Sequence, residues 1–192
     1  FSRVQMTTKP VQKPVPIWIA AIGPKALEEA GAQGYNLAAG GPADLQKIYD
    51  MALEKAGHDP QKVQRANLHI GHLAETDEKA WDEAEPHMRY YIEWQAGMVK
   101  AQRALNPNAP VHSDMELAVP PLGELRKTGR GPYAQAFVGS PETVIEQLED
   151  ELRVYPLTQI IWSMGLPGQD PRQADRSAEL FAKEVMPHFK HK

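Results

Sequence analysis

Residues 10–34 read PVQKPVPIWIAAIGPKALEEAGAQG and carry the clearest fold signal, because they join a buried strand to a helix through a tight turn. The apolar run at residues 17–22 is typical of a parallel strand covered on both faces. Gly23 and Pro24 then open a helix over residues 24–32, whose first N–H groups have no acceptor within the helix. Such a helix start attracts anions, so the Gly-Pro-Lys turn is a candidate phosphate cradle with Lys25 as an added positive charge.

Three further apolar stretches, at residues 36–39, 68–73 and 159–163, also read as strands, and each is followed by helical sequence. Alternating strands and helices predict an α/β fold with a parallel sheet and right-handed crossovers. Four βα units make half of an eight-stranded TIM-type βα barrel. An open half barrel exposes two unpaired strand edges and an apolar inner face. We therefore expect this half to need a partner, either a missing N-terminal half or a second copy of the chain.

The composition is that of a globular protein of 192 residues, 42% hydrophobic, with a formal net charge of -4. The charge argues against a nucleic-acid partner. The absence of an 18-residue apolar run argues against a membrane span, and the first residues lack the pattern of a secretory signal, so we expect a cytoplasmic protein. With no cysteine in the chain, disulfides and thiolate chemistry are excluded.

Three segments, in the same order along the chain, resemble the bacterial luciferase-like family of flavin-dependent monooxygenases. They are the PVQKPVPIW lead-in at residues 10–18, FVGSPETVIEQL at residues 137–148, and LPGQDPRQADRSAELFAKEVMPHF at residues 166–189. The resemblance implies that residues 1–192 form the C-terminal half of a single βα-barrel domain. It also implies a mobile lid over residues 106–137, where Pro and Gly are frequent and periodicity is weak; an ordinary surface insertion is the alternative.

Site residues follow from the same resemblance. Ile22, Gly23, Pro24 and Lys25 fall where the family holds the flavin phosphate, although the hydroxyl residue that many relatives carry in this turn is absent here. The alternative is a plain strand-to-helix turn with a solvated lysine. One or two of Trp162, Ser163 and Met164, at the end of the last strand, are expected to lie beneath the flavin ring or the substrate, and strand alternation does not tell which. Core packing of Trp162 and Met164 is the alternative.

The implied function is oxidation of a small organic substrate with oxygen and reduced flavin mononucleotide (FMN), which a separate flavin reductase supplies. The family also implies a homo-oligomer. A deazaflavin-dependent oxidoreductase that transfers hydride is a second interpretation, which the Gly-Pro-Lys turn favours, and a non-catalytic flavin-binding protein or inactive fragment is a third. The sequence identifies no catalytic acid or base.

A metal site is not predicted. His69 and His72 lie three residues apart on a strand, so their side chains point to opposite faces. The sequence contains no HExxH motif or paired CxxC that would complete a site.

Overall fold

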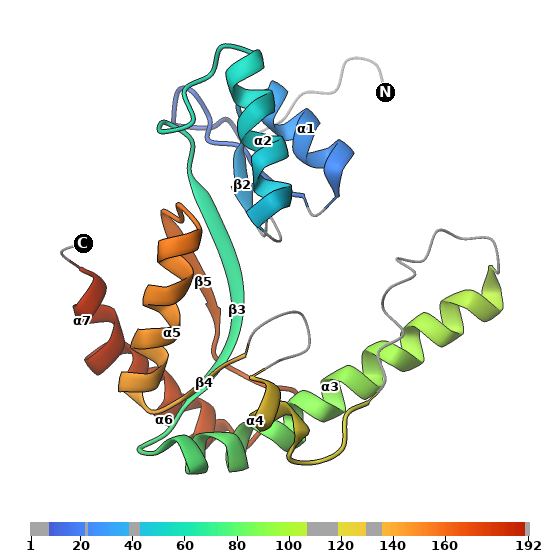
Figure 1. Cartoon of the computed structure of the whole chain (residues 1–192), viewed down its shortest axis with the longest axis vertical. Helices are drawn as coiled ribbons and strands as arrows, with labels where there is room; N and C mark the ends of the chain where they lie inside the picture. Colours follow the sequence, from blue (N-terminus) through green and yellow to red (C-terminus); the bar gives the residue numbers. More distant parts are fainter. Residues whose placement is uncertain (1–7, 22, 39–42, 107–118, 130–135, 191–192) are drawn as a thin grey trace. The chain divides into compact units, whose positions relative to one another are not determined.

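The computed structural model describes residues 8–21, 23–38, 43–106, 119–129 and 136–190. Its elements alternate between strands and helices over most of the chain (Figure 1). The strands are β1 (Trp18–Ala20), β2 (Asn36–Ala38), β3 (Arg65–Leu73), β4 (Phe137–Gly139) and β5 (Gln159–Ser163). The helices are α1 (Pro24–Ala32), α2 (Ala43–Lys55), α3 (Asp77–Leu105), α4 (Glu124–Thr128), α5 (Pro141–Val154), α6 (Pro171–Leu180) and α7 (Met186–Phe189), with a π-helical turn η1 (Phe181–Val185) between α6 and α7.

The sheet order is β1-β2-β3-β4, and β5 also pairs with β3. The β1–β2, β2–β3 and β3–β4 pairs are parallel, as predicted. All four predicted strands are present, and β3 begins at Arg65 rather than at residue 68. The three-residue strand β4 was not predicted. It pairs with the last residues of β3, with Gly71 opposite Phe137 and Leu73 opposite Gly139.

The chain divides into two compact units. The first contains residues 1–68 and 154–161, and its core lies between the strands and helices α1 and α2. Leu27 and Ala30 point inward from α1. Helix α1 approaches α2 closely at Gly31, where an added Cβ would lie 2.5 Å from the carbonyl oxygen of Tyr49.

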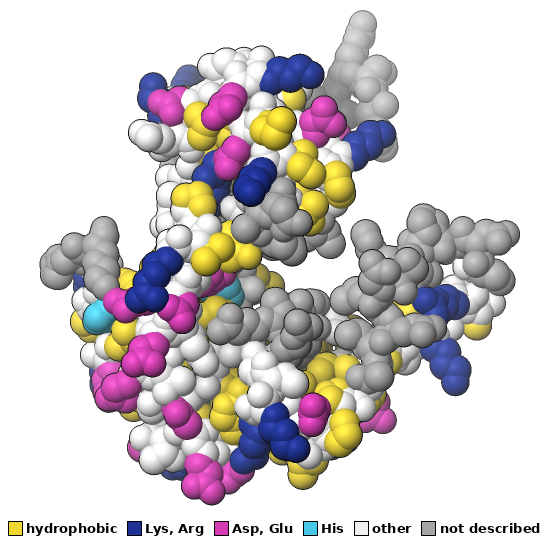
Figure 2. Space-filling view, in the orientation of Figure 1, with side chains coloured by type: hydrophobic (Ala, Val, Ile, Leu, Met, Phe, Trp, Pro, Cys, Tyr) yellow, Lys and Arg dark blue, Asp and Glu magenta, His cyan; other side chains and the backbone are white. Residues whose placement is uncertain are grey.

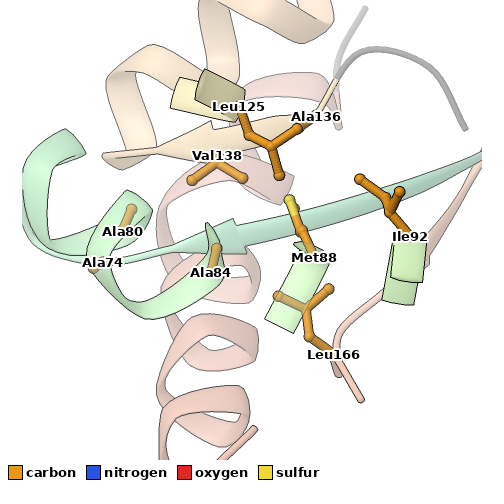
Figure 3. Packing of buried hydrophobic residues seen from close by; sticks show 9 residues of the cluster. All are labelled: Ala74, Ala80, Ala84, Met88, Ile92, Leu125, Ala136, Val138 and Leu166. Carbon is orange, nitrogen blue, oxygen red and sulfur yellow. The ribbon is translucent and has the colours of Figure 1, made fainter. Parts of the chain in front are cut away.

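The second unit contains residues 69–153 and 162–192. Figure 3 shows its main core, in which one face of α3 meets β4, α4 and the loop after β5. The buried members of this core are Ala74, Ala80, Ala84, Met88, Ile92, Leu125, Ala136, Val138 and Leu166.

Helix ends in the second unit follow local sequence signals. Thr76 caps α3 by accepting a hydrogen bond from the N–H of Lys79 at 3.2 Å, and Asp170 caps α6 through the N–H of Arg172 at 3.0 Å. Two prolines lie within helices. Pro86 is inside α3, which runs from Asp77 to Leu105, and Pro187 is in the first turn of α7.

Of the predicted lid at residues 106–137, the structure describes residues 106, 119–129 and 136–137. Helix α4 lies within this segment and is attached to α3. The buried carboxylate of Glu85 accepts hydrogen bonds from the N–H groups of Gly123 and Leu125 at 2.7 and 3.1 Å. The lid itself stays a prediction.

Candidate functional site

The predicted phosphate turn forms the start of α1. Gly23 is the N-cap residue, with extended backbone angles of φ −116° and ψ 154°, and Pro24 occupies the first helical turn. The carbonyl oxygen of Gly23 accepts the N–H of Leu27 at 3.0 Å. The N–H groups of Lys25 and Ala26 therefore precede the helical hydrogen-bond ladder and can be offered to an external acceptor.

Space and charge at this turn both suit an anion. A Cβ atom added to Gly23 would meet nothing within 4 Å, so neither sterics nor backbone angle requires glycine there. No side chain caps the helix start, and no acidic residue lies in the first turn of α1. A bound phosphate would thus meet backbone donors and the Lys25 ammonium without a nearby carboxylate in that turn. Ile22, the remaining member of the predicted set, lies outside the described residues.

A groove of about 930 Å³ runs between α1 and α2 beside the turn. Pro24 and Lys25 line it together with Glu28 and Lys55, and apolar side chains of α2 form much of its wall. Among these, Met51 is 69% exposed.

Trp162 occupies a packed position in the second unit. Its ring stacks on Phe181 with centroids 4.5 Å apart and planes inclined by 28°. It also covers Gly71, where an added Cβ would lie 2.0 Å from the indole ring. The indole nitrogen Nε1 is buried without a hydrogen-bond partner in the part of the chain that the structure describes. These contacts are those of a core side chain.

Met164 is half-buried at the start of the loop between β5 and α6. This loop is held by the side chain of Gln169, whose Oε1 accepts the N–H of Leu166 at 3.1 Å. Gly168 adopts a left-handed conformation with φ +76°, a backbone demand that favours glycine. Met164 is therefore carried by a loop of defined shape.

A polar network that sequence reasoning missed lies at the end of β3. His72 is fully buried; its Nε2 lies 2.9 Å from Oε2 of Glu83 on α3, and its Nδ1 accepts from Nε2 of Gln169 at 3.1 Å. Arg176 of α6 donates to both oxygens of Glu83 at 2.5 and 2.6 Å. Burial lowers the pKa of His72, and this effect outweighs the opposing effect of the Glu83 carboxylate. The neutral ring is thus the form that the fold favours.

His69 faces another element, as the strand alternation predicted. Its Nε2 lies 2.8 Å from Oε2 of Glu151 on α5, and its ring lies 4.3 Å from that of Phe137. The two histidines of β3 consequently contact different helices. Within the described residues there is no group of three or more His, Asp or Glu side chains placed to bind a metal ion. Nor do those residues include a helix with the length and apolar character needed to cross a membrane.

Solved structures share this fold. Monooxygenase RslO1 from Streptomyces bottropensis is similar over 96% of this chain and 51% of its own, with a TM-score of 0.61 and 19% identity. The FMN complex of the oxygenating constituent of 3,6-diketocamphane monooxygenase from Pseudomonas putida is similar over 90% of this chain and 48% of its own, with a TM-score of 0.59 and 23% identity. The coenzyme F420-dependent tetrahydromethanopterin reductase from Methanopyrus kandleri matches over 93% and 52%, with a TM-score of 0.57 and 19% identity.

The chain spans about half the length of each of these structures. The likeness shows that its fold is part of a βα barrel with a parallel sheet. A family model described as luciferase-like monooxygenase matches residues 1–156, which is most of the chain. The chain therefore belongs to the luciferase-like monooxygenase family.

Proposed function

We propose that the chain is part of a flavin-dependent monooxygenase and that it binds the flavin phosphate at the start of α1. The observation that carries the proposal is the open space at Gly23, beside an uncapped helix start without acidic residues in its first turn. Family membership supports the general kind of chemistry.

Each residue of the turn has a separate task in this proposal. Gly23 leaves room for a phosphate oxygen close to the backbone, the N–H groups of Lys25 and Ala26 donate hydrogen bonds, and the Lys25 ammonium adds charge. Pro24 fixes the first helical residue without requiring an acceptor of its own. When bound, reduced FMN from a flavin reductase would supply the electrons that let oxygen oxidise a small organic substrate.

We extend the proposal to Met164 and Trp162 at the end of β5. Met164 is the candidate for contact with the flavin ring or the substrate, because it is partly exposed and lies on a loop that the side chain of Gln169 fixes. Trp162 supports that strand end through its stacking on Phe181. The remaining units of the barrel, from the same polypeptide or a second copy, would complete the pocket.

A deazaflavin coenzyme is the second candidate. Two structures similar to this chain are F420-dependent enzymes, a reductase and a secondary alcohol dehydrogenase. The Gly-Pro-Lys turn favours the same interpretation. Hydride transfer would then replace oxidation by oxygen. A measurement of oxygen consumption distinguishes the two functions, because only the monooxygenase consumes oxygen. Flavin binding with neither activity would favour the non-catalytic alternative.

The test compares FMN with riboflavin, which lacks the phosphate. We expect the 192-residue chain to bind FMN at least about tenfold more tightly than riboflavin in a fluorescence titration. The reason is that charge-assisted hydrogen bonds to a phosphate contribute more than about 1 kcal/mol to the free energy of binding. Gly23→Leu should remove that difference by filling the open space, and Lys25→Ala should reduce it.

Ala32→Leu is the control, because it places a leucine at the other, exposed end of α1. Lys183→Ala is the control for Lys25→Ala; Lys183 is an exposed lysine of the second unit. Equal affinities for FMN and riboflavin, or equal losses in Gly23→Leu and Ala32→Leu, would overturn the phosphate assignment.

A further inference from the structure

The C-terminal half of α3 has an exposed apolar face that the proposed function does not use. The first half of the helix buries one side in the core of the second unit, through Ala84, Met88 and Ile92. On a different side, Tyr90, Trp94, Met98 and Leu105 are 56%, 52%, 54% and 88% exposed. Figure 1 shows this half of α3 extending past α4.

Two large residues and then three small ones follow one another along this face with a coiled-coil spacing. Tyr90, Trp94, Gly97, Ala101 and Ala104 follow one another at spacings of four, three, four and three residues. That spacing is the signature of a helix that packs against another helix along a narrow seam. The ring of Tyr91 stacks on Trp94 with centroids 5.8 Å apart, so Trp94 is held in place at the surface.

Two opposite charges flank the seam on one side. Glu93 and Lys100 each come directly before a seam residue, Trp94 and Ala101, and they are seven residues apart. Both side chains are exposed. In an antiparallel pair of helices, the residues that come directly before the seam residues of one helix lie next to the equivalent residues of the other helix. In a parallel pair they lie instead next to residues on the other side of the partner's seam.

We propose that two copies of this chain associate through antiparallel pairing of their α3 helices. In that arrangement Trp94 of each copy packs against Gly97 of the other, and Tyr90 against Ala101, so a large side chain meets a small one in each of these layers. An added Cβ at Gly97 would meet nothing within 4 Å, which leaves room for an indole ring. Glu93 of each copy lies near Lys100 of the other. A parallel pair would instead bring Trp94 against Trp94 and leave both charges without an opposite partner.

The partner that fits this face of α3 is a second copy of the chain. In the antiparallel pair, large side chains of one helix lie opposite small ones of the other, and each negative charge lies near a positive one. On the face shown in Figure 2, acidic and basic side chains are interspersed over the described residues. The pairing needs neither flavin nor the start of α1, and its failure would leave the proposed function unaffected.

Charge reversal tests the pairing by sedimentation equilibrium over a range of micromolar concentrations. We expect the wild-type chain to dimerise and Glu93→Lys or Lys100→Glu alone to weaken the dimer about tenfold, because each places like charges together at two symmetric positions. An equimolar mixture of the two variants should form a heterodimer of nearly wild-type affinity, since every charge then meets its opposite. Trp94→Ala should weaken the dimer at least as much as either reversal.

Glu54→Lys and Lys47→Glu on α2 are matched controls, because both residues are exposed and lie in the other unit. Their dimerisation should equal that of the wild type. A wild-type chain that stays monomeric, a dimer that is insensitive to the α3 reversals, or a mixture that fails to recover affinity would each overturn the proposal. Association through exposed sheet edges, for example, would give the insensitive dimer.

Discussion

The Nδ1 atom of His72 accepts a hydrogen bond from the side-chain amide of Gln169 at 3.1 Å. The same Gln169 side chain accepts the N–H of Leu166, so β3 fixes the loop that carries Met164. Because Nδ1 acts as an acceptor, the ring proton lies on Nε2, where it is donated to Glu83. A second proton on Nδ1 would replace this contact with a clash of donors.

The first prediction is that acid weakens the fold through His72. Burial lowers its pKa in the folded state, whereas the unfolded residue binds a proton near its ordinary value of 6.5. Folding therefore releases a proton below pH 6.5. Above pH 6.5 the titration of His72 does not lower the free energy of unfolding. As the pH falls from 6.5 toward the folded-state pKa, it lowers that free energy by at most about 1.4 kcal/mol per pH unit.

The measurement is the free energy of unfolding in urea at several pH values between neutral and mildly acidic. Glu83 and His87 of α3 and Arg176 of α6 also face or influence His72, so the wild-type slope contains more than one group. His72→Gln removes one titrating site, and its slope should be shallower. The exposed His58 provides the control in His58→Gln. Identical slopes in wild type and His72→Gln would refute the assignment.

The second prediction concerns Asp77, which joins the start of α3 to the start of α5. Its carboxylate accepts the N–H of Ser140 at 2.7 Å and the hydroxyl of Thr143 at 3.0 Å. The Ser140 N–H, with help from the Thr143 hydroxyl, lowers the pKa of Asp77 below its ordinary value of 3.8. Asp77→Asn should cost about 1 kcal/mol of unfolding free energy at neutral pH, as expected for a helix-capping carboxylate.

The pH dependence of the free energy of unfolding shows whether Asp77 stabilises the fold through its negative charge or only through its contacts. The stabilisation by Asp77 is present above pH 3.8 and is lost as the pH falls through the lower, folded-state pKa. The difference between wild type and Asp77→Asn should therefore shrink in acid. Asp175→Asn, at an exposed position on α6, should be neutral at every pH. A difference that stays constant in acid would show that the charge plays no part.

Local signals mark the helix starts, whereas contacts between distant parts of the chain have no local signal. Ser140-Pro141 and Asp170-Pro171 carry a cap and a proline within two residues, and the structure begins α5 and α6 there. Strand β4 has three residues, too few for a periodicity to appear, and it exists because it pairs with β3. Glu83 and Arg176 are 93 residues apart, so no sequence pattern could place them together.

The candidate site likewise contains one part that depends on local sequence and one part that depends on long-range contacts. The helix start at Gly23 is a local feature, and the prediction of its boundaries at residues 24–32 is confirmed. By contrast, alternation along β5 could not tell whether Trp162 faces a pocket or a helix. That depends on Phe181, which the fold brings from a different element.

The third prediction tests the close approach of α1 and α2. A Cβ on residue 31 would lie 2.5 Å from the Tyr49 carbonyl oxygen and 2.8 Å from Cβ of Ala52. Backbone atoms cannot yield easily, so Gly31→Ala should destabilise the first unit by about 1–3 kcal/mol despite its better helix propensity. Thermal unfolding followed by circular dichroism measures the loss. Gly165→Ala, where the added atom meets nothing within 4 Å, should change the midpoint little, and a similar midpoint for both variants would contradict the packing.

The last prediction concerns Glu85, whose buried carboxylate attaches α4 to α3. In addition to the two backbone N–H groups, it accepts the Nε–H of Arg126 at 3.0 Å. Glu85→Gln keeps the size of the side chain but brings an NH₂ group against these donors, so it should cost about 2 kcal/mol or more. Because the loss falls on α4, trypsin should cleave after Arg126 or Lys127 faster than in the wild type.

Asp82→Asn is the matched control for Glu85→Gln. Asp82 binds the same Arg126 at 2.7 Å, but its side chain is 60% exposed, and such surface pairs contribute under about 1 kcal/mol. We expect its cleavage rate to stay close to that of the wild type. If both variants were cleaved equally fast, the Arg126 ion pairs rather than the capped backbone of α4 would hold this segment. If only Glu85→Gln is cleaved faster, the buried carboxylate is the group that holds α4 on α3, because it accepts the N–H groups of Gly123 and Leu125 at the start of α4.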